Sequence, residues 1–557
     1  MQLPRRENGL GEPLASRDPR AGMSAGVRAA RAAFDERWRR EGWHRGATLG
    51  TALAAGAQAH ADTPVTFASA LRPATLTVGE LHARGRAIAG SLQAIGLRAG
   101  DVIAVQLPNW PETAVLYHAA AALGLVLIPI VPIYGPAEVS FILRQSGARA
   151  FVLPARHRRI DAARDLPRLD AGPALEHVIV VAGDAPEGTL AWSALEATPP
   201  QPFPEPDADP GDVALIVYTS GTTAEPKGVQ HSHDSLIAEL HACPTPPPDT
   251  PGTVSLQPFP AGHTAGLCAL LAIALHGYPT IIIDDWNAER CARLIEEHGV
   301  TAVAGTPYMI GAILDALEAT GARHDRLVHG ITGGGGVPPA LIERADAIGW
   351  HISRCYGATE GPSLTAGAPG DPLEKRANTD GRALAGNRMR IVDDEGRDLP
   401  VGEAGEIATI GPEQFLGYTD PALNATAFLP DGWFLTGDIG RIDADGCLTI
   451  TDRKKDIIIR GGENISSQEV EDVLVRMPGV AEVAVVAAPD DRYGERVCAF
   501  IVARDGARLD AEAVLAHFER AGVARHKAPE RLELVAELPR TPAGKVRKHE
   551  LRALLRD

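Results

Sequence analysis

The chain is poor in cysteine and in positive charge. Its 557 residues include six widely scattered cysteines and no CxxC pair. This spacing fits a reducing compartment and matches no zinc-site pattern. Acidic residues outnumber basic ones, which gives a formal net charge of -17 at pH 7. Such a charge disfavours non-specific binding to DNA or to anionic membranes, so nucleic acid is not an expected partner.

Uninterrupted membrane-length apolar runs are also missing. Two apolar stretches, Ala114–Ile133 and Ala265–Ile283, are broken by glycine, proline and histidine. Each is therefore interpreted as a helix, a turn and a buried strand. The N-terminus lacks the apolar core of a signal peptide. We expect a cytoplasmic protein without stable membrane insertion, with a flexible N-terminal extension and a leading helix over residues 1–45.

What the sequence does contain is an alternation of helix and strand patterns. Thr77–Ile95 begins with a Thr-x-x-Glu capping box and continues as an amphipathic helix. Val102–Leu107 follows it as a strand, and further buried strands are predicted at Thr280–Ile283, Ala302–Ala304 and Gly330–Thr332. The length exceeds that of one ordinary core, so several domains are expected. The predicted fold class is α/β, built from layered units.

The last third of the chain has a different pattern. Strands at Arg388–Val392 and Glu406–Ile410 predict a small β-rich subdomain. A mixed pattern follows, with helices at Gln468–Met477 and Ala511–Ala521 and strands at Val483–Ala487 and Val497–Val502. These final residues, about a hundred of them, are enough for a separate α+β domain.

Two glycine-containing segments are candidate binding loops. Tyr218–Val229, YTSGTTAEPKGV, follows the apolar strand pattern Val213–Val217 and combines hydroxyls, glycines and Lys227. Such residues can hold phosphate groups at a strand end, although the spacing is not that of a Walker A loop. A polar surface loop is the alternative. Gly333–Gly336 leave the backbone bare, so that a flat or bulky group can lie against it, unless they form only a tight turn.

Taken in order, the motifs resemble the adenylate-forming superfamily of acyl-CoA synthetases, peptide-synthetase adenylation domains and luciferases. They are YTSGTTAEPKGV, GGGGVPP, YGATEG, TGD, DRKKDIIIRGGENIS and PRTPAGKVRK. The resemblance runs nearly end to end. It implies a large N-terminal domain of two layered α/β units and a β-barrel over residues 46–454. A mobile C-terminal lid over residues 455–557 would follow, with its hinge at Lys455.

The resemblance also implies the chemistry. A carboxylate is a poor electrophile, so ATP would convert it to an acyl-adenylate with release of pyrophosphate. A thiol, that of coenzyme A, would then attack and release AMP. Negative charge collects at the α-phosphorus in the first step, so Mg²⁺ and a lysine are expected there. ATP, Mg²⁺ and coenzyme A are therefore the expected cofactor and co-substrates.

Site residues are carried over by motif position. The β- and γ-phosphates would be held by Thr219, Ser220, Gly221, Thr222, Thr223 and Lys227. Thr359 would contact the α-phosphate and Glu360 would bind Mg²⁺. The nucleoside would lie between Tyr356, which stacks on adenine, and Asp438, which holds the ribose with Arg453. Its remaining contacts would come from Gly333, Gly334, Gly335, Gly357 and Ala358.

The lid would supply the remaining groups. Lys545 would bridge the carboxylate and the α-phosphate, although a single lysine near a C-terminus is more often a solvated surface charge. Gly461, Gly462 and Glu463 would line the tunnel for the thiol arm, where a β-turn is the structural alternative. Three positions depart from common family residues. Ala224 replaces a glycine, Ser467 stands where proline is common, and Ile459 stands where some relatives have a lysine that serves the thiol step.

The substrate is less specified. His263 matches a position that gates the acyl pocket in relatives, and Gly305, Met309, Gly334 and Gly335 would form its floor. This small-residue lining favours a bulky or ring-containing acid. The sequence also resembles ligases of alicyclic, aryl and medium-chain acids, so a hydrophobic, medium-sized, cyclic or aryl acid is expected. One alternative is an acyl-AMP ligase that loads a carrier protein, and another is a non-catalytic nucleotide-binding module. A homodimer is compatible with either enzyme.

Overall fold

The computed structural model describes residues 18–198, 208–219, 226–242, 252–368, 370–460, 463–490, 492–504, 507, 509–521, 523–541 and 544–555. The chain divides into two units. The first comprises Met1–His241, Pro260–Asp285 and Pro412–Thr426, and the second comprises Ala242–Phe259, Trp286–Gly411 and Ala427–Asp557. Within the described residues, no helix is long and apolar enough to cross a membrane.

An eight-stranded sheet organises the first unit. Its order is β21-β11-β10-β4-β3-β5-β8-β9. The strands are β3 (Val102–Val105), β4 (Val126–Pro129), β5 (Ala150–Pro154), β8 (His177–Val181), β9 (Leu190–Ala191), β10 (Val213–Thr219), β11 (Lys227–Ser232) and β21 (Gly417–Tyr418). A separate set joins β1 (Pro64–Ala68) to β2 (Ala74–Thr77) and β13 (Thr280–Ile283).

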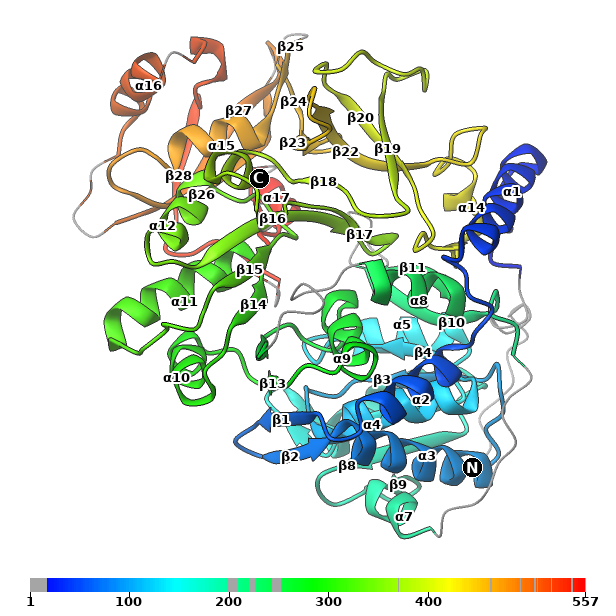
Figure 1. Ribbon diagram of the computed structural model, residues 1–557. Coiled ribbons are helices and arrows are strands. Elements are labelled where there is room, and N and C mark those ends of the chain that lie inside the picture. Colours follow the sequence, from blue (N-terminus) through cyan, green and yellow to red (C-terminus); the bar gives the residue numbers. More distant parts are fainter. Residues whose placement is uncertain are drawn as a thin grey trace. The chain divides into compact units, whose positions relative to one another are not determined.

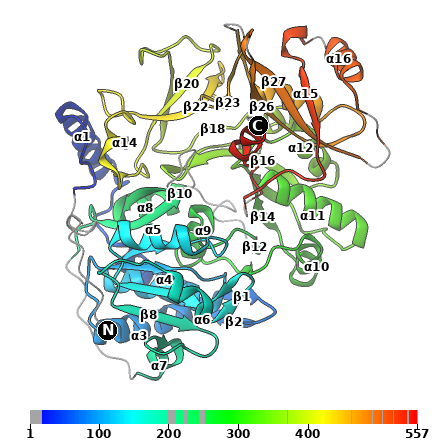
Figure 2. The same cartoon turned by 180° about the vertical axis from the view of Figure 1, so that it is seen from behind.

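Helices cover both faces of this sheet. On one face are α2 (Leu49–Ala59), α3 (Val78–Ala94), α4 (Pro111–Leu123), α8 (His233–Ala242) and α9 (Thr264–His276), which share one hydrophobic cluster with the strands (Figure 1). On the other face is α5 (Pro136–Ser146), seen in front of the strands in Figure 2. Alternate residues of β3, such as Ile103 and Ala104, point into the two different clusters. A strand buried on both faces is typical of parallel sheets in α/β proteins.

Both broken apolar runs are helix, turn and strand, as predicted. The first forms α4 and β4, joined at Gly124 with φ 69°. The second forms α9 and β13, with Gly277 at φ 67° ending the helix. A left-handed residue at this position ends a helix at little steric cost only when it is glycine. The predicted helix at Thr77 is also confirmed, with both hydrogen bonds of its capping box formed.

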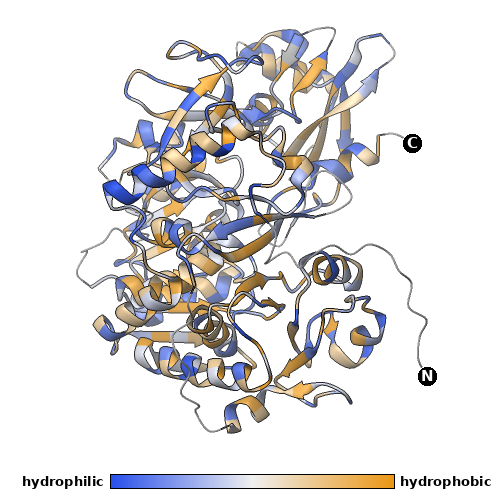
Figure 3. Cartoon of the chain, turned by 90° about the vertical axis from the view of Figure 1, so that its right-hand side faces the viewer, coloured by the Kyte–Doolittle hydropathy of each residue, from blue (hydrophilic) through white to orange (hydrophobic). Residues whose placement is uncertain are grey.

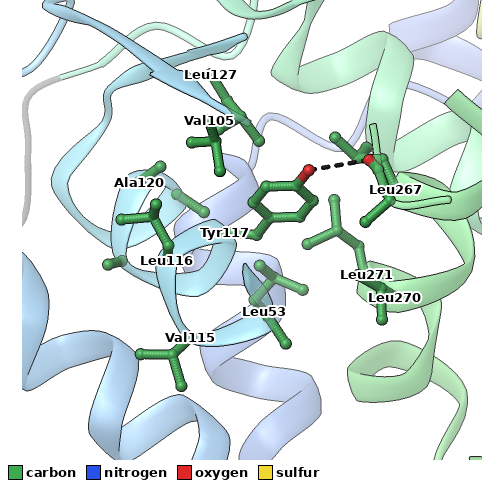
Figure 4. Packing of buried hydrophobic residues seen from close by; sticks show 14 of the residues in the cluster. Leu53, Val105, Val115, Leu116, Tyr117, Ala120, Leu127, Leu267, Leu270 and Leu271 are labelled. Carbon is green, nitrogen blue, oxygen red and sulfur yellow. Dashed lines mark hydrogen bonds between the residues drawn. The ribbon is translucent and has the colours of Figure 1, made fainter. Parts of the chain in front are cut away.

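Tyr117 marks the centre of the larger cluster. Its ring lies among Leu53 of α2, Leu127 of β4 and Leu271 of α9 (Figure 4). Its hydroxyl donates a hydrogen bond to the carbonyl oxygen of Ala261 at 2.9 Å. A buried phenol needs such a partner, because an unpaired hydroxyl in an apolar core is costly.

The leading helix predicted within residues 1–45 is α1 (Ala25–Glu41). It packs in the first unit against the segment around Phe415, whose carbonyl oxygen accepts a hydrogen bond from Arg31 Nη2 at 2.6 Å. Arg31 is buried, and burial lowers the pKa of its guanidinium to about 9. The first seventeen residues lie outside the described part, so the expected flexible extension stays a prediction.

The second unit begins with a mixed sheet. Four parallel strands, β12 (Ser255–Gln257), β14 (Ala302–Gly305), β15 (His329–Thr332) and β16 (His351–Ala358), are followed by antiparallel β17 (Gly361–Ala366) and β18 (Arg382–Ala383). Accompanying helices are α10 (Ala288–His298), α11 (Pro307–Thr320), α12 (Pro339–Ala347) and α13 (Leu373–Asn378). The strands predicted at Ala302 and Gly330 are therefore confirmed.

The predicted β-rich subdomain is a four-stranded antiparallel sheet. It contains β19 (Arg388–Val392), β20 (Gly405–Ile410), β22 (Phe434–Ile442) and β23 (Leu448–Arg453). Figure 3 shows hydrophobic residues, in orange, along many of the strands of the molecule. In the four-stranded sheet, the hydrophobic residues include Ile391, Ile407 and Leu448, which pack with Tyr356 of β16 in one cluster.

The C-terminal segment has its own sheet and core. Its strands are β24 (Ile458–Arg460), β25 (Glu463–Ile465), β26 (Val480–Asp490), β27 (Gly494–Ala503) and β28 (Arg531–Leu534). Its helices are α15 (Ser467–Leu474), α16 (Ala511–Arg520) and α17 (Lys548–Ala553). The predicted elements over this region are all present, with ends that differ by a few residues. The predicted fold class, α/β with a smaller C-terminal α+β part, is thus confirmed, whereas the part expected to be a β-barrel is a four-stranded antiparallel sheet.

A buried ion pair joins the mixed sheet to the β-rich sheet. Asp380 Oδ1 accepts hydrogen bonds from Arg354 Nε at 2.9 Å and from Arg354 Nη2 at 2.8 Å. The other oxygen accepts the backbone N–H of Ile450 on β23 at 2.9 Å. Both charged side chains are almost entirely buried, so each compensates for the lost hydration of the other. This contact sets the position of β16 relative to β23.

Replacing Asp380 with alanine should therefore destabilise the protein. The change leaves the Arg354 guanidinium buried without its partner, at a cost of roughly 3–5 kcal/mol. Urea-induced unfolding is the measurement. The matched control is Asp325→Ala, which breaks the solvent-exposed pair of Arg323 and Asp325 at 2.7 Å and should change the unfolding midpoint little. Equal losses in the two variants would show that the buried pair has no special role.

Candidate functional site

A β-hairpin presents the predicted nucleotide-binding residues. β16 and β17 pair so that Ala358 lies opposite Gly361, which leaves Thr359 and Glu360 as the two residues of the tip. Gly357 is required for this turn, because a Cβ at that position would lie 1.8 Å from the carbonyl oxygen of Pro362. Tyr356 is buried at the base of the hairpin. Adjacent positions on one hairpin thus hold five of the predicted site residues together.

Tyr356, Asp438 and Arg453 form a connected set. The Tyr356 hydroxyl donates to Asp438 Oδ2 at 2.7 Å. Arg453 Nε lies 3.2 Å from Asp438 Oδ1, and the two residues are directly opposite each other on β22 and β23. Asp438 is also held by its own backbone N–H, which donates to Thr436 Oγ1 at 3.1 Å. The structure therefore brings together three residues that the sequence placed in separate motifs.

The phenol of Tyr356 stays protonated in this setting. Burial raises its pKa well above the ordinary value, and the negative charge of Asp438 raises it further. A protonated phenol can donate to a carboxylate but cannot compete with it for cations. One oxygen of Asp438 is thus committed to Tyr356, while the other faces Arg453.

Lys545 lies on a short turn close to this set. The Thr541 N–H donates to the Lys545 carbonyl oxygen at 2.7 Å, and the Gly544 N–H donates to the Thr541 carbonyl oxygen at 2.8 Å. Gly544 has φ 81°, and a Cβ there would lie 3.0 Å from Tyr308. Lys545 Cε in turn lies 3.9 Å from the position of a Cβ built on Gly334. The turn therefore fits between α11 and the glycine run.

The charges around Lys545 alter its titration. Although the residue remains exposed to solvent, the surrounding protein displaces enough water to lower its pKa to about 8. The positive charge of Arg453 also lowers the pKa, whereas Asp438 and Glu360 raise it. These effects place the ammonium group of Lys545 among the residues predicted to hold the nucleotide. A lysine near its pKa at neutral to mildly basic pH is a frequent feature of functional sites.

The predicted hinge lies at a turn that follows β23. The backbone N–H groups of Asp456 and Ile457 both donate to the carbonyl oxygen of Arg453, at 2.8 and 3.1 Å. Burial lowers the pKa of Lys455, and Arg453 lowers it further. Of the predicted tunnel residues, Glu463 is at the start of β25, while Gly461 and Gly462 lie outside the described residues.

In the first unit, the two ends of the predicted phosphate loop are adjacent. Thr219 ends β10 and Lys227 begins β11, and the two residues are directly paired. Lys227 Nζ lies 5.8 Å from the centroid of the Tyr418 ring. Ser220, Gly221, Thr222, Thr223 and Ala224 lie outside the described residues. The strand that the sequence predicts before the loop is confirmed.

His263 is held in place by its neighbours. It is the N-cap residue of α9. Ala261, two residues earlier, makes two hydrogen bonds. Its N–H donates to Asn109 Oδ1 at 2.7 Å, and its carbonyl oxygen accepts one from the Tyr117 hydroxyl. Gly262 packs so closely on Val131 that a Cβ would lie 2.7 Å from its backbone. No feature of the sequence indicated that Asn109 and Tyr117 hold this loop.

The predicted acyl-pocket residues of the second unit lie at the ends of its parallel strands. Gly305 ends β14, and Met309, which is 1% exposed, follows on α11. A Cβ on Gly305 would lie 3.3 Å from that of Met309. Gly335 has open space around it, whereas Gly333 is packed on Cys355. Tyr308, between Gly305 and Met309, was missed by sequence reasoning, because only the folded chain brings it to Gly544.

Three comparisons place these observations among known proteins. The sequence model described as AMP-binding enzyme matches residues 53–419, and that of the AMP-binding enzyme C-terminal domain matches residues 469–545. A medium-chain fatty-acid–CoA ligase of Escherichia coli is 35% identical over 86% of this chain and 86% of its own length. An indoleacetate–CoA ligase of Aromatoleum aromaticum is 33% identical over 86% and 93%.

Solved structures agree with the sequence comparison. The crystal structure of ATP-bound MatB from Rhodopseudomonas palustris superimposes with a TM-score of 0.81 at 28% identity. The match covers 92% of this chain and 99% of that chain. The similarity thus extends over nearly all of both chains.

The titration of Lys545 can be tested directly. Labelling with an amine-reactive reagent across a pH series, read by mass spectrometry, should give a midpoint near pH 8 for Lys545. Asp438→Asn should lower the midpoint, because it removes an attractive charge, and Arg453→Gln should raise it. Lys375, whose pKa is raised by ion pairs with Asp443 and Asp445, serves as the internal control that reacts only at higher pH. A midpoint for Lys545 at the ordinary lysine value would contradict the arrangement.

Proposed function

We propose how this protein acts from the premise that it belongs to the AMP-binding enzyme family. It is an AMP-forming acid–thiol ligase that joins a carboxylic acid to coenzyme A. The carboxylate first attacks the α-phosphorus of ATP, which gives an acyl-adenylate and pyrophosphate. The thiol of coenzyme A then attacks the acyl carbon, which gives the thioester and AMP.

The grouping of Lys545 with Glu360, Asp438 and Arg453 is the observation that carries the assignment of roles. The first step joins two anions, so positive charge is needed where the carboxylate and α-phosphate meet. Lys545 is the flexible cation of this set, and we assign it to that point. Asp438 presents a carboxylate oxygen suited to the ribose hydroxyls, with Arg453 fixing its orientation. Tyr356 forms the apolar wall beside the base.

The phosphates require further groups. We assign Lys227, with the hydroxyl-rich residues 219–223, to the β- and γ-phosphates. Thr359 is assigned to the α-phosphate. Glu360, half-buried at the hairpin tip, suits Mg²⁺, which commonly takes one or two protein carboxylates together with substrate phosphates. The described residues contain no group of three or more metal-ligating side chains. When bound, Mg²⁺ would neutralise phosphate charge.

The second step needs a thiol acceptor and a path by which it reaches the acyl-adenylate. Coenzyme A is the proposed thiol donor, entering along Gly461, Gly462 and Glu463 after the lid, residues 455–557, rotates at Lys455. Water hydrolyses an acyl-adenylate. A lid that is closed during the first step would exclude water, and its rotation would then open the path for the thiol in the second step. A carrier-protein thiol is the alternative acceptor. A cytoplasmic setting and a homodimer complete the proposal.

The acid is proposed to be hydrophobic and of medium size, cyclic or aryl. The open space around Gly335, beside Gly334, leaves room for a bulky group, and the closely packed Gly305 and Met309 would form an apolar floor. The names of two relatives, a medium-chain fatty-acid–CoA ligase and an indoleacetate–CoA ligase, support this class. A screen of carboxylic acids for ATP-dependent pyrophosphate release identifies the substrate. If no acid supports release, the non-catalytic nucleotide-binding alternative is favoured.

Lys545→Ala should separate the two half-reactions. Pyrophosphate release should fall by at least ~100-fold, because a preorganised positive charge at the α-phosphorus is lost. Thioester formation from presynthesised acyl-adenylate and coenzyme A should be largely retained. Lys375→Ala, which removes a lysine paired with Asp443 and Asp445, is the control and should leave both steps unchanged. Equal loss of both steps in the Lys545 variant would refute the assigned role.

The pH dependence follows from the same lysine. Because the pKa of Lys545 is lowered to about 8, its positive charge is present below that pH and is lost above it. kcat/KM for ATP in the adenylation step should therefore fall by about tenfold per pH unit above pH 8. In Lys545→Arg the guanidinium stays charged, so the residual activity should show no such decline. An unchanged profile in that variant would assign the titration to another group.

A further inference from the structure

A buried polar network connects three segments near the proposed hinge. Ser467, at the first position of α15, donates its backbone N–H to Asp452 Oδ2 and its hydroxyl to Asp452 Oδ1 at 3.1 Å. Lys548, the first residue of α17, donates from Nζ to Ser467 Oγ at 2.8 Å. Ser467 is fully buried and Asp452 is 5% exposed. One serine therefore joins a strand of the β-rich sheet to two helices of the C-terminal segment.

Lys548 is the cation between the two carboxylates of this network, those of Asp452 and Glu471. Lys548 Nζ also lies 2.8 Å from Glu471 Oε1, whose second contact is the N–H of Val485 at 2.7 Å. Burial raises the pKa of Glu471, and Lys548 opposes this shift. Removing a partner from such a network leaves a buried polar group unsatisfied, which costs more than a surface contact.

The network crosses the hinge. Asp452 lies on β23, before Lys455, whereas Ser467, Glu471 and Lys548 all follow it. The far end of α17 also makes a contact beside the hinge, because Arg552 donates a hydrogen bond to the carboxylate of Asp456. Lys548 is three residues after Lys545, so the start of α17 fixes where the lysine turn begins. A rotation of the lid would separate Ser467 from Asp452.

We infer that Ser467 is a positioning residue, a latch that holds the C-terminal segment where the Lys545 turn packs against Tyr308 and Gly334. This inference rests on the proposed function, because it assigns to Ser467 a share in the balance between adenylation and thioester formation. A proline at this position would have neither the N–H nor the hydroxyl that reaches Asp452.

The latch can be tested without any catalytic activity. In Ser467→Ala and in Lys548→Met, labelling of Lys545 across a pH series should move its midpoint upward from about 8 toward an ordinary lysine value, as the side chain leaves its neighbours. Lys527→Met is the matched control, because Lys527 pairs with Glu469 of the same helix at 2.7 Å without crossing the hinge. An unchanged midpoint in both latch variants overturns the inference, whether or not an acid is activated.

The half-reactions give a second measurement once an acid is known. The ratio of the thioester-forming rate to the adenylation rate should rise by about tenfold in Ser467→Ala, the size of a population shift expected from losing hydrogen bonds to a charged group. Ser467→Pro should raise it further, and Lys527→Met should not change it. Equal slowing of both steps would mean that Ser467 only stabilises the fold. If the native protein activates no acid but the latch variants still shift the labelling midpoint of Lys545, the proposed function is refuted and the latch remains supported.

Discussion

Pairing of buried charge is the constraint on which the second unit depends. Arg354 and Asp380 fix β16 against β23. The buried Asp438 on the adjacent β22 then lies next to Tyr356 of β16 and is paired with the more exposed Arg453 of β23. An unpaired charge in these positions would be unstable, so the sheets can meet in few ways. The alignment of the predicted nucleotide-binding residues is a result of this pairing.

The same principle connects the C-terminal segment to the β-rich sheet. Ser467 and Asp452 satisfy each other's buried polar groups, and Lys548 is neutralised by Glu471. Lys545, nearby in sequence, is left on a turn whose ammonium titrates under the influence of Arg453 and Asp438. Stability and reactivity therefore come from one continuous set of charges. A change in the position of the C-terminal segment would alter both.

Much of the local structure could be predicted from the residues. The broken apolar runs became α4 with β4 and α9 with β13, because glycine ends a helix and β-branched residues favour a strand. The capping box at Thr77 formed as expected. Such signals act over a few residues, so they can be recognised without knowledge of the fold. The motif order likewise indicated the family that the comparisons show.

Contacts between distant segments could not be predicted. Tyr308 meets Gly544, and Asp452 meets Ser467, only through the packing of whole elements. Neither pair has a spacing or a composition that distinguishes it. The side chains of Asn109 and Tyr117 that hold Ala261 are a further example. In the sequence, nothing distinguishes these two side chains from other polar residues, because their contacts form only in the folded chain.

The sequence by itself determined which chemical groups are available, in what order, and which local elements carry them. The tertiary structure decided which groups share a site. It surrounded Lys545 with protein that displaces water and brought the positive charge of Arg453 near it, and both effects lower the pKa of a side chain that sequence alone treats as an ordinary surface lysine. The physical reason is that hydration and Coulomb interactions depend on distances in space, which residue order does not specify.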